Sequence, residues 1–440
     1  MKTILISSFH QLISRNILST PLLDKLLEDP EMQAVLLVPD DKQMFFQENF
    51  GRERVFVHGF PRAMDRRDMI MRYLALSAVH TDALEIIREV ESGRFLSRFV
   101  RLFGSFSLGQ AVIRLIDRII TPRGRFSGVL KKYSPALVFS TDIQNENDVR
   151  LIHEARAARV PVVGAIRSWD NLTTKGMIRV LPDTLVVPNL IVKQEAMVID
   201  FVPERIIAPI GIPHYDRYFT PSPEPRDEFF RRMGLDSVKK TILFAPVGNR
   251  YIKNNLLDKT VAETLGGLDV NLLIRVPPSD YASLDGIKAT KANVVFDVVG
   301  RGSPRGNIDR KLNEMGRADD DSLVAELSYC DVVVTGHSTI TIDAAAFNKP
   351  VVLIAFDEVP RPFNESIRRY YKCDYYLPIT KSGGVRFAET REALNPLVLR
   401  YLKDPRLEEV GRRRIVEEQA YRFDGKATER LVEALRSFLD

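Results

Sequence analysis

The residues best suited to chemistry in this sequence follow an apolar run that ends at Thr335. Gly336 comes next and permits a tight turn, and His337, Ser338 and Thr339 follow it. Ser338 or Thr339 can cap a following helix, whose first N–H groups and positive dipole end attract phosphate. The pattern predicts a phosphate site at the carboxyl end of a strand. A plain helix cap with a solvent-facing histidine is the alternative.

Cations that could serve the same anionic ligand follow another apolar run, Thr241–Ala245. Gly248 closes the turn, and Arg250 and Lys253 come shortly after it. Arginine contacts a diphosphate in a bidentate manner and lysine acts as a point charge, so both could neutralise a diphosphate leaving group. A solvated loop without a specific role is the alternative.

A polar run, Arg317–Ser322, is expected to be a loop that leads into a helix at Leu323. Its acids suit a helix N-terminus, where carboxylates interact favourably with the helix dipole. Asp320 and Ser322 could also lie beside a nucleobase. The run contains a DxD pattern, but we interpret it as a helix cap, so no metal site is predicted.

A loop in the first half of the chain holds the only tryptophan and follows the apolar run Val160–Ala165. It contains Trp169, Asp170, Asn171 and Lys175, which is an unusual set for a simple connection. Asp170 could take a proton from an acceptor hydroxyl, and Lys175 could hold an acceptor phosphate. Alternatively, Trp169 packs beneath a linker and Asp170 caps a turn.

Two further residues occupy equivalent positions after apolar runs, His10 after the first run and Asp142 after the run that ends at Ser140. The ordinary pKa of histidine suits proton transfer at neutral pH, whereas an aspartate needs burial to raise its pKa. The general base is therefore left open between His10, Asp142 and Asp170.

Buried parallel strands are needed to position these side chains, and the sequence contains two sets of short apolar runs separated by helical stretches. Such runs predict two α/β domains with parallel sheets. A cluster of prolines between Pro203 and Pro225 is interpreted as the hinge. The expected strands are Thr3–Ser7, Ala34–Val38, Ala136–Ser140, Val160–Ala165, Leu185–Val187, Thr241–Ala245, Val270–Val276, Asn293–Val298, Asp331–Thr335 and Val351–Ala355.

One segment, residues 94–132, carries nine basic residues and one acid, Asp117, interleaved with aromatic and aliphatic residues. This composition fits an amphipathic surface that meets anionic lipid head groups or a phosphorylated acceptor. A core-facing helix with a solvated basic face is the equal alternative, and no nucleic-acid motif is present. The basic residues are Arg94, Arg98, Arg101, Arg114, Arg118, Arg123, Arg125, Lys131 and Lys132.

The composition of the 440 residues is that of a globular protein, with 45% hydrophobic and 28% charged residues and a net charge of +5. The two cysteines, Cys330 and Cys373, are far apart, which excludes a disulfide framework and a thiolate zinc site. There is no Walker A, GxGxxG, HExxH or GxSxG pattern, which disfavours P-loop, dinucleotide-binding, zincin and hydrolase functions.

Four segments resemble the GT-B superfamily of nucleotide-sugar glycosyltransferases, and within it the CDP-glycerol glycerophosphotransferases and related surface-polysaccharide transferases. The segments are Gly211–Asp216, Gly336–Ala346, Asn348–Leu353 and Phe423–Arg430. The resemblance implies two Rossmann-like domains that face each other across a cleft, an acceptor-binding domain at 1–205, a donor-binding domain at 206–415, and a C-terminal helix at 416–440 that returns to the first domain.

The resemblance also assigns roles. His337, Ser338 and Thr339 would contact the donor diphosphate, Arg250 and Lys253 would support the leaving group, and Asp320 to Ser322 would lie near the base. Asp343 would fall inside the following helix and point towards the donor. The superfamily stabilises the departing nucleotide with cations and helix dipoles and without a metal, so no tightly bound cofactor is expected.

Transfer of a sugar is preferred to transfer of glycerophosphate, because His337 is the only clear member of the phosphate-holding histidines and arginines expected of a glycerophosphate polymerase. We therefore expect a metal-independent glycosyltransferase that uses a nucleotide-sugar, acts on a lipid-linked or surface-glycan acceptor, and is peripheral at the inner, cytoplasmic face of a membrane. A CDP-glycerol-type glycerophosphotransferase and a non-catalytic scaffold that docks at the membrane through residues 94–132 are the alternatives.

Overall fold

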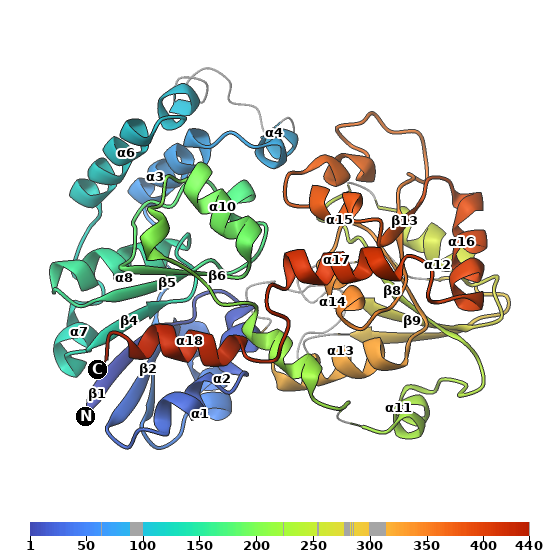
Figure 1. Cartoon of the computed structure of the whole chain (residues 1–440), viewed down its shortest axis with the longest axis horizontal. Coiled ribbons are helices and arrows are strands. Elements are labelled where there is room, and N and C mark those ends of the chain that lie inside the picture. The colour runs from blue at the N-terminus through green and yellow to red at the C-terminus, as the bar shows by residue number, and fades with distance from the viewer. Residues whose placement is uncertain are drawn as a thin grey trace. The chain divides into compact units, whose positions relative to one another are not determined.

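The structure, a computed structural model, describes residues 1–62, 64–88, 100–222, 224–252, 255–276, 282, 284, 286–298 and 314–439. The chain forms two compact units, drawn in Figure 1. Unit 1 consists of Met1–Asp216 and Gln419–Asp440, and unit 2 consists of Arg217–Glu418. The sequence-based limits fall at residues 205/206 and 415/416.

Unit 1 is built on a seven-stranded sheet with the strand order β3-β2-β1-β4-β5-β6-β7, and every neighbouring pair is parallel. The order of the strands reverses between β1 and β4, which creates a switch point at their carboxyl ends. The strands are β1 (Lys2–Ser7), β2 (Met32–Pro39), β3 (Val55–Phe60), β4 (Leu137–Ser140), β5 (Val162–Ala165), β6 (Thr184–Val187) and β7 (Ile207–Pro209).

Helices connect these strands in unit 1. The α-helices are α1 (Leu22–Leu27), α2 (Gln43–Phe50), α3 (Arg66–Ala78), α4 (Asp82–Arg88), α6 (Ser107–Ile120), α7 (Ser127–Tyr133), α8 (Glu146–Ala157), α9 (Asn171–Thr174), α10 (Leu190–Val198) and α18 (Ala427–Arg436). Shorter helices of other types are η1 (Ser14–Leu18), η2 (Asp40–Lys42), η3 (Glu204–Ile206) and η4 (Pro213–Phe219).

Unit 2 contains a six-stranded sheet with the order β10-β9-β8-β11-β12-β13, again parallel throughout, and its switch point lies between β8 and β11. The strands are β8 (Thr241–Ala245), β9 (Asn271–Val276), β10 (Asn293–Val298), β11 (Val332–Thr335), β12 (Val351–Ile354) and β13 (Val385–Ala388). The helices are α11 (Arg226–Met233), α12 (Leu257–Leu265), α13 (Arg317–Tyr329), α14 (Ile340–Ala346), η5 (Ile367–Lys372), α15 (Leu377–Lys381), α16 (Arg391–Lys403) and α17 (Glu409–Gln419).

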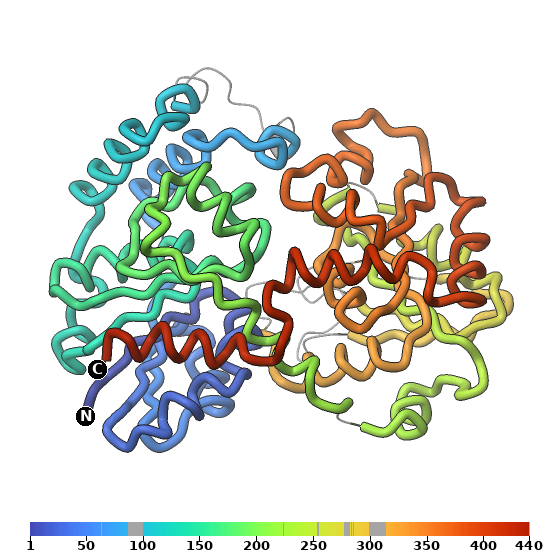
Figure 2. Tube along the Cα trace, in the orientation of Figure 1, coloured from blue at the N-terminus to red at the C-terminus, as the bar shows by residue number. Residues whose placement is uncertain are grey.

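The last helix, α18, belongs to unit 1 although it follows the whole of unit 2 in sequence. Figure 2 traces this return of the chain, which ends beside the N-terminal strand. Leu431, Val432 and Leu435 of α18 are buried in the same hydrophobic core as the side chains of β1 and β2. The two ends of the sequence are therefore joined in one core.

The predicted α/β class with two Rossmann-like parallel sheets is confirmed, and all ten predicted strands are present. Three strands were not predicted, namely β3, β7 and β13, and each lies at an edge of its sheet. Edge strands need fewer apolar residues because one side is not covered by a neighbour. Strand β7 also lies inside the proline cluster, so part of the predicted hinge is sheet.

In the part of the chain that the structure describes, no helix combines the length and the apolar composition that crossing a lipid bilayer requires.

Candidate functional site

Two loops of unit 2 meet at the switch point, because β8 and β11 are paired and Ala245 lies opposite Thr335. The loop after β8 turns at Gly248, whose φ of +86° is in the region that favours glycine. The backbone N–H groups of Val247 and Gly248 donate to the buried carboxylate of Asp258, at 2.7 and 2.9 Å. Gly248 therefore shapes the loop, and its N–H group is already used within the protein.

His337 lies in the neighbouring loop and is enclosed by aromatic rings. Its ring stacks on Tyr370 with centroids 4.0 Å apart and planes 7° apart, and it meets Tyr251 edge-on at 4.5 Å. The side-chain Nδ1 atom is buried and has no hydrogen-bond partner among the described residues. The His337 residue as a whole is only partly exposed, and it places at the switch point a hydrogen-bonding atom that no described residue uses.

The charges that act on His337 are both positive. Burial, and to a smaller extent the positive charges of Arg369 and Arg250, lower the pKa of the His337 ring to about 3. The ring is thus neutral at physiological pH. A neutral imidazole offers one N–H donor, and the positive charge of the site comes from the two arginines.

Arg369 is a member of this site that the sequence pattern did not indicate. It belongs to η5, which Asp357 fastens by accepting hydrogen bonds from the Ser366 hydroxyl at 2.5 Å and the Ile367 N–H at 3.1 Å. The Arg369 guanidinium donates to the Tyr251 carbonyl at 3.2 Å and to the Tyr370 hydroxyl at 2.7 Å. Its Nε atom is buried and makes no hydrogen bond to any described residue.

Of the two predicted cations, Arg250 is exposed and its guanidinium lies 5.6 Å from the centre of the Tyr251 ring. Lys253 lies outside the described residues. The site that the structure brings together after β8 and β11 thus contains His337, Arg250 and the unpredicted Arg369.

The predicted helix cap is present only in part. The Ser338 hydroxyl accepts from the Ile340 N–H at 3.5 Å, whereas the Thr339 side chain, at the cap position of α14, makes no capping hydrogen bond. Helix α14 is only seven residues long. Asp343 lies within it and is buried, and its carboxylate accepts a hydrogen bond from the Tyr218 hydroxyl at 2.8 Å.

Asp320 and Ser322 lie in the first turns of α13, which begins at Arg317, so the helix start predicted at Leu323 is wrong. The interpretation of the acidic run as a cap is confirmed, because Asp319 accepts a hydrogen bond from the Gly316 N–H at 2.9 Å. The run therefore belongs to the helix itself, whereas the sequence assigned it to a loop.

A buried charge network fixes α13 on the neighbouring strands. Arg275 of β9 contacts Asp297 of β10 at 2.7 Å and Glu326 of α13 at 2.9 Å. Burial raises the pKa of Glu326 to about 8, and the positive charge of Arg275 acts in the opposite direction. Ser322 donates to Asp297 at 3.4 Å. Ser322 and Asp320 are therefore held near the carboxyl ends of β9 and β10.

In unit 1 the three candidate bases follow β1, β4 and β5, which are adjacent strands. Asp142 is buried and forms an ion pair with Arg167. The neighbouring carboxyl group of Asp148 accepts hydrogen bonds from the hydroxyls of Ser7 and Ser140. Burial raises the pKa of Asp148 to about 7, and the negative charge of Asp142 acts in the same direction. Asp142 is therefore committed to an internal ion pair.

His10 is held by a backbone contact that decides its tautomer. Its Nδ1 atom accepts a hydrogen bond from the Leu12 N–H at 3.2 Å. In the neutral ring the proton is then on Nε2, so the outer nitrogen is a donor. A base needs a free lone pair at the atom that takes the proton, and this tautomer does not provide one at Nε2.

Asp170 differs from the other two candidates. It is partly exposed, it makes no side-chain cap at the start of α9, and its Oδ2 atom accepts only a long 3.4 Å hydrogen bond from Thr174. Beside it, Trp169 and Asn171 are buried, and the Asn171 Nδ2 atom has no partner among the described residues. Lys175 is partly exposed at the end of the same short helix. Asp170 is thus the more available of the two candidate carboxylates.

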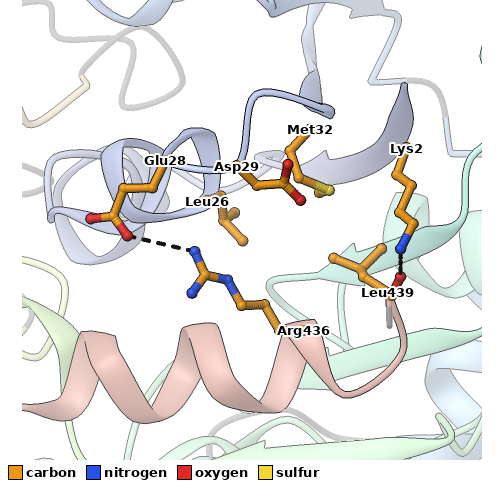
Figure 3. Close-up of a pocket in the computed structure, with 7 residues that line it drawn as sticks. All are labelled: Lys2, Leu26, Glu28, Asp29, Met32, Arg436 and Leu439. Atoms are coloured by element: carbon orange, nitrogen blue, oxygen red, sulfur yellow. Dashed lines mark hydrogen bonds and ion pairs between the residues drawn. The ribbon is translucent and has the colours of Figure 1, made fainter.

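A pocket of about 420 Å³ lies at the amino ends of the strands of the unit 1 sheet, away from the candidate bases at their carboxyl ends (Figure 3). Lys2 and Met32, which begin β1 and β2, line it together with Glu28 and Arg436, whose charged groups are 3.6 Å apart. None of the predicted site residues borders this pocket. Open parallel sheets bind ligands at their carboxyl ends, so we do not assign the chemistry to it.

Among the described residues, no group of three or more histidine, cysteine, aspartate or glutamate side chains is arranged to hold a metal ion.

Residues 182–437 match the model of a protein family described as CDP-Glycerol:Poly(glycerophosphate) glycerophosphotransferase. No curated protein matches the chain. A glycosyltransferase from Rickettsia africae is 11% identical, with a TM-score of 0.53 over 100% of this chain and 99% of its own. The UDP-GlcNAc 2-epimerase from Neisseria meningitidis is 12% identical, with a TM-score of 0.52 over 99% of this chain and 100% of its own. The wall teichoic acid polymerase TagF is 14% identical, with a TM-score of 0.53 over 99% and 89%.

These likenesses confirm the GT-B fold that the sequence predicts. A glycosyltransferase, an epimerase and a polymerase share it, so the fold by itself does not determine the reaction.

We predict that the His337 ring stays neutral from pH 8 to pH 5, because its pKa is about 3. An ordinary histidine changes charge near pH 6.5. In NMR spectra, the imidazole resonance that is missing from His337→Gln identifies this ring, and its chemical shift should not change across this range. A free-histidine standard in the same sample should titrate normally, and a midpoint above pH 5.5 for His337 would contradict the enclosed arrangement.

The lowered pKa of His337 also makes the free energy of unfolding depend on pH. The unfolded chain takes up a proton on this ring below about pH 6.5, whereas the folded chain does so only near pH 3, so the free energy of unfolding falls as the pH drops between these values. His337→Gln should remove this contribution. The urea midpoint of the variant should therefore depend less on pH between 7 and 5 than that of the wild type.

Proposed function

Because the chain belongs to this family of glycerophosphotransferases, we propose that it transfers a glycerophosphate-type group from a CDP-activated donor to a lipid-linked or glycan acceptor. The observation that carries the proposal is the group of His337, Arg369 and Arg250 at the carboxyl ends of β8 and β11. Two guanidinium groups beside a neutral donor suit a diphosphate.

Donor binding belongs to unit 2 in this proposal. The guanidinium groups of Arg369 and Arg250 balance the charge that develops on the departing nucleotide, and His337 donates a hydrogen bond to a phosphate oxygen. Ser338 and Thr339 add hydroxyls from the same loop. Asp320 and Ser322, on the first turns of α13, lie towards the base, and Gly248 sets the shape of the first loop.

Acceptor binding belongs to unit 1. Asp170 takes the proton of the acceptor hydroxyl, whose oxygen forms a bond to the phosphorus of the transferred group while the bond between that phosphorus and the oxygen of CMP breaks. Asn171 and Lys175 bind the acceptor, and Trp169 supports the loop from beneath. Asp142 acts indirectly, since its ion pair positions Arg167 next to Asn171.

Transfer of a sugar is the second candidate. His337 is the only histidine between Arg217 and Glu418, and a single histidine is a small set for a polymerase of glycerophosphate units. The same cations would then stabilise a nucleoside diphosphate as the leaving group.

Because the proposed acceptor is lipid-linked or a glycan, we place the protein peripherally at the inner face of a membrane. The basic residues of segment 94–132 support this location. Within this segment Arg94 and Arg98 lie outside the described residues, and Arg101 pairs with Glu85 at 2.9 Å. The exposed basic side chains that remain available to anionic lipids are Arg118, Arg123, Lys131 and Lys132.

A panel of donors separates the two candidates. Incubation with CDP-glycerol should release CMP, because the bond that breaks lies between the two phosphates. With UDP-, GDP-, CDP- or TDP-linked sugars the released product would be a nucleoside diphosphate, which indicates sugar transfer. If the purified protein neither binds nor cleaves any donor of the panel, the proposed function is wrong.

Arg369→Ala should weaken the binding of CDP at least tenfold in calorimetry, because a hydrogen bond to a charged group contributes roughly 1.5–3 kcal/mol. Arg368→Ala is the matched control, since Arg368 is the neighbouring residue of η5 and its side chain is 56% exposed. Equal losses in the two variants would argue against a specific role of Arg369.

Asp170→Asn should lower kcat for transfer by about 10²-fold or more, since general base catalysis contributes this much, while the affinity for CDP stays unchanged. The variant should also lose the acid limb of the pH–rate profile, which a change in loop structure alone would leave in place. Activity within threefold of the wild type would assign the proton transfer to another group.

A further inference from the structure

The side chain of Tyr370 lies where three segments of the proposed donor site in unit 2 meet. The segments follow β8, β11 and β12, which are neighbouring strands of the sheet, and they carry Tyr251, His337 and Tyr370 itself. Loops that follow neighbouring parallel strands come together at the carboxyl ends of those strands. Tyr370 is only 8% exposed, so protein contacts hold it on almost every side.

The ring of Tyr370 sets the plane of the His337 ring. The two rings are nearly parallel, with their planes 7° apart and their centroids 4.0 Å apart. The Tyr251 ring meets both of them edge-on, at 4.5 Å from His337 and 5.4 Å from Tyr370. A rotation of the imidazole would break these contacts, which are favourable geometries for aromatic pairs. The two tyrosine rings therefore decide the directions in which the nitrogen atoms of His337 point.

The hydroxyl of Tyr370 holds a different group, the guanidinium of Arg369. It accepts a hydrogen bond from the Arg369 Nη2 atom at 2.7 Å and donates one to the Tyr251 carbonyl at 3.2 Å. The same Nη2 atom also donates to that carbonyl at 3.2 Å, so the three groups form a closed set of hydrogen bonds. The guanidinium is thus fastened to the protein through Nη2.

Two nitrogen atoms next to Tyr370 are left without a partner in the part of the chain that the structure describes. They are Nδ1 of His337 and Nε of Arg369, and both are buried. A buried polar atom that makes no hydrogen bond costs free energy, so a pair of them at one site indicates a ligand that would bond to both. Tyr370 orients one of these side chains through its ring and the other through its hydroxyl.

The next residue of η5, Tyr371, shows the contacts of a tyrosine that only supports the fold. It is 7% exposed, which matches the burial of Tyr370. Its hydroxyl donates to the carbonyl of Ile354, the last residue of β12, at 2.6 Å, and its ring meets Phe387 of β13 at 5.1 Å. Neither of these two partners belongs to the proposed donor site. The two tyrosines are therefore alike in burial and differ in what they hold.

From these contacts we propose that Tyr370 is a positioning residue of the donor site, which aims His337 and Arg369 at the same diphosphate. The inference rests on the proposed function, because that function supplies the ligand. A guanidinium recognises phosphate through hydrogen bonds in a fixed planar geometry. Its release from the Tyr370 hydroxyl therefore weakens binding even though the arginine is still present.

The first test is the affinity of the full chain for CDP in calorimetry. Tyr370→Phe keeps the ring and removes the hydroxyl, and it should weaken CDP binding at least about threefold, which is the effect of one hydrogen bond. Tyr371→Phe is the matched control, because it removes a hydroxyl of equal burial from the same helix, and it should bind CDP as the wild type does. Equal affinities of the two variants would overturn the proposal.

A double-mutant cycle tests whether the hydroxyl acts through Arg369. In the Arg369→Ala background, Tyr370→Phe should change the CDP affinity by less than about 1.5-fold, because the group that the hydroxyl holds is then absent. A loss of general stability would weaken binding by the same factor in both backgrounds. Equal factors in the two backgrounds would overturn the role assigned to the hydroxyl.

The role of the ring has a spectroscopic signature in the His337 imidazole resonance, which is identified by its absence from His337→Gln. A stacked ring displaces this resonance from the position of an unstacked histidine. The displacement should persist in Tyr370→Phe and disappear in Tyr370→Leu. A resonance that loses its displacement in Tyr370→Phe, or keeps it in Tyr370→Leu, would overturn the role of the ring.

These measurements separate the inference from the proposed function. A wild type that does not bind CDP would contradict the proposed function and, with it, the role of Tyr370 in binding. A wild type that binds CDP, with Tyr370→Phe equal to it, would contradict the role of Tyr370 alone.

Discussion

Every strand of both sheets runs parallel to its neighbours, and this one constraint decides where chemistry can occur. In a parallel sheet the loops that follow the strands all lie at the carboxyl ends. Where the strand order reverses, neighbouring loops run to opposite sides of the sheet and leave a crevice between them. His337 and Arg250 come together in unit 2 because β8 and β11 flank such a point. In unit 1, β1, β4 and β5 bring His10, Asp142 and Asp170 to one edge for the same reason.

The second constraint is electrostatic. The site in unit 2 places a ring that burial keeps neutral beside two guanidinium groups, and both groups act against protonation of that ring. Two guanidinium groups beside one neutral ring favour an anionic ligand, because the ligand brings negative charge to the site. In unit 1 the charges of Arg167 and Asp142 neutralise each other, and Asp170 is the more available carboxylate.

The sequence predicts the strands well because short, continuous apolar runs are typical of parallel strands that helices cover on both faces. It also predicts the loop of His337, since that loop follows a run directly. Arg369 could not be found in this way, because it approaches His337 only through η5 and the stacking of Tyr370, which are tertiary contacts. The burial of Arg114 was missed for a related reason. A basic residue on an amphipathic helix is expected outside, and its inward position depends on the carbonyls of Ile178 and Asp200, which lie far from it in sequence.

Binding of the donor diphosphate by the loops after β8 and β11 is tested most directly by a crystal structure of the protein with CDP. We predict that phosphate oxygens lie within hydrogen-bond distance of the His337 ring and the Arg369 guanidinium. The assignment would be contradicted by a diphosphate bound elsewhere, with His337 still stacked on Tyr370 and Arg369 still bonded to the Tyr370 hydroxyl.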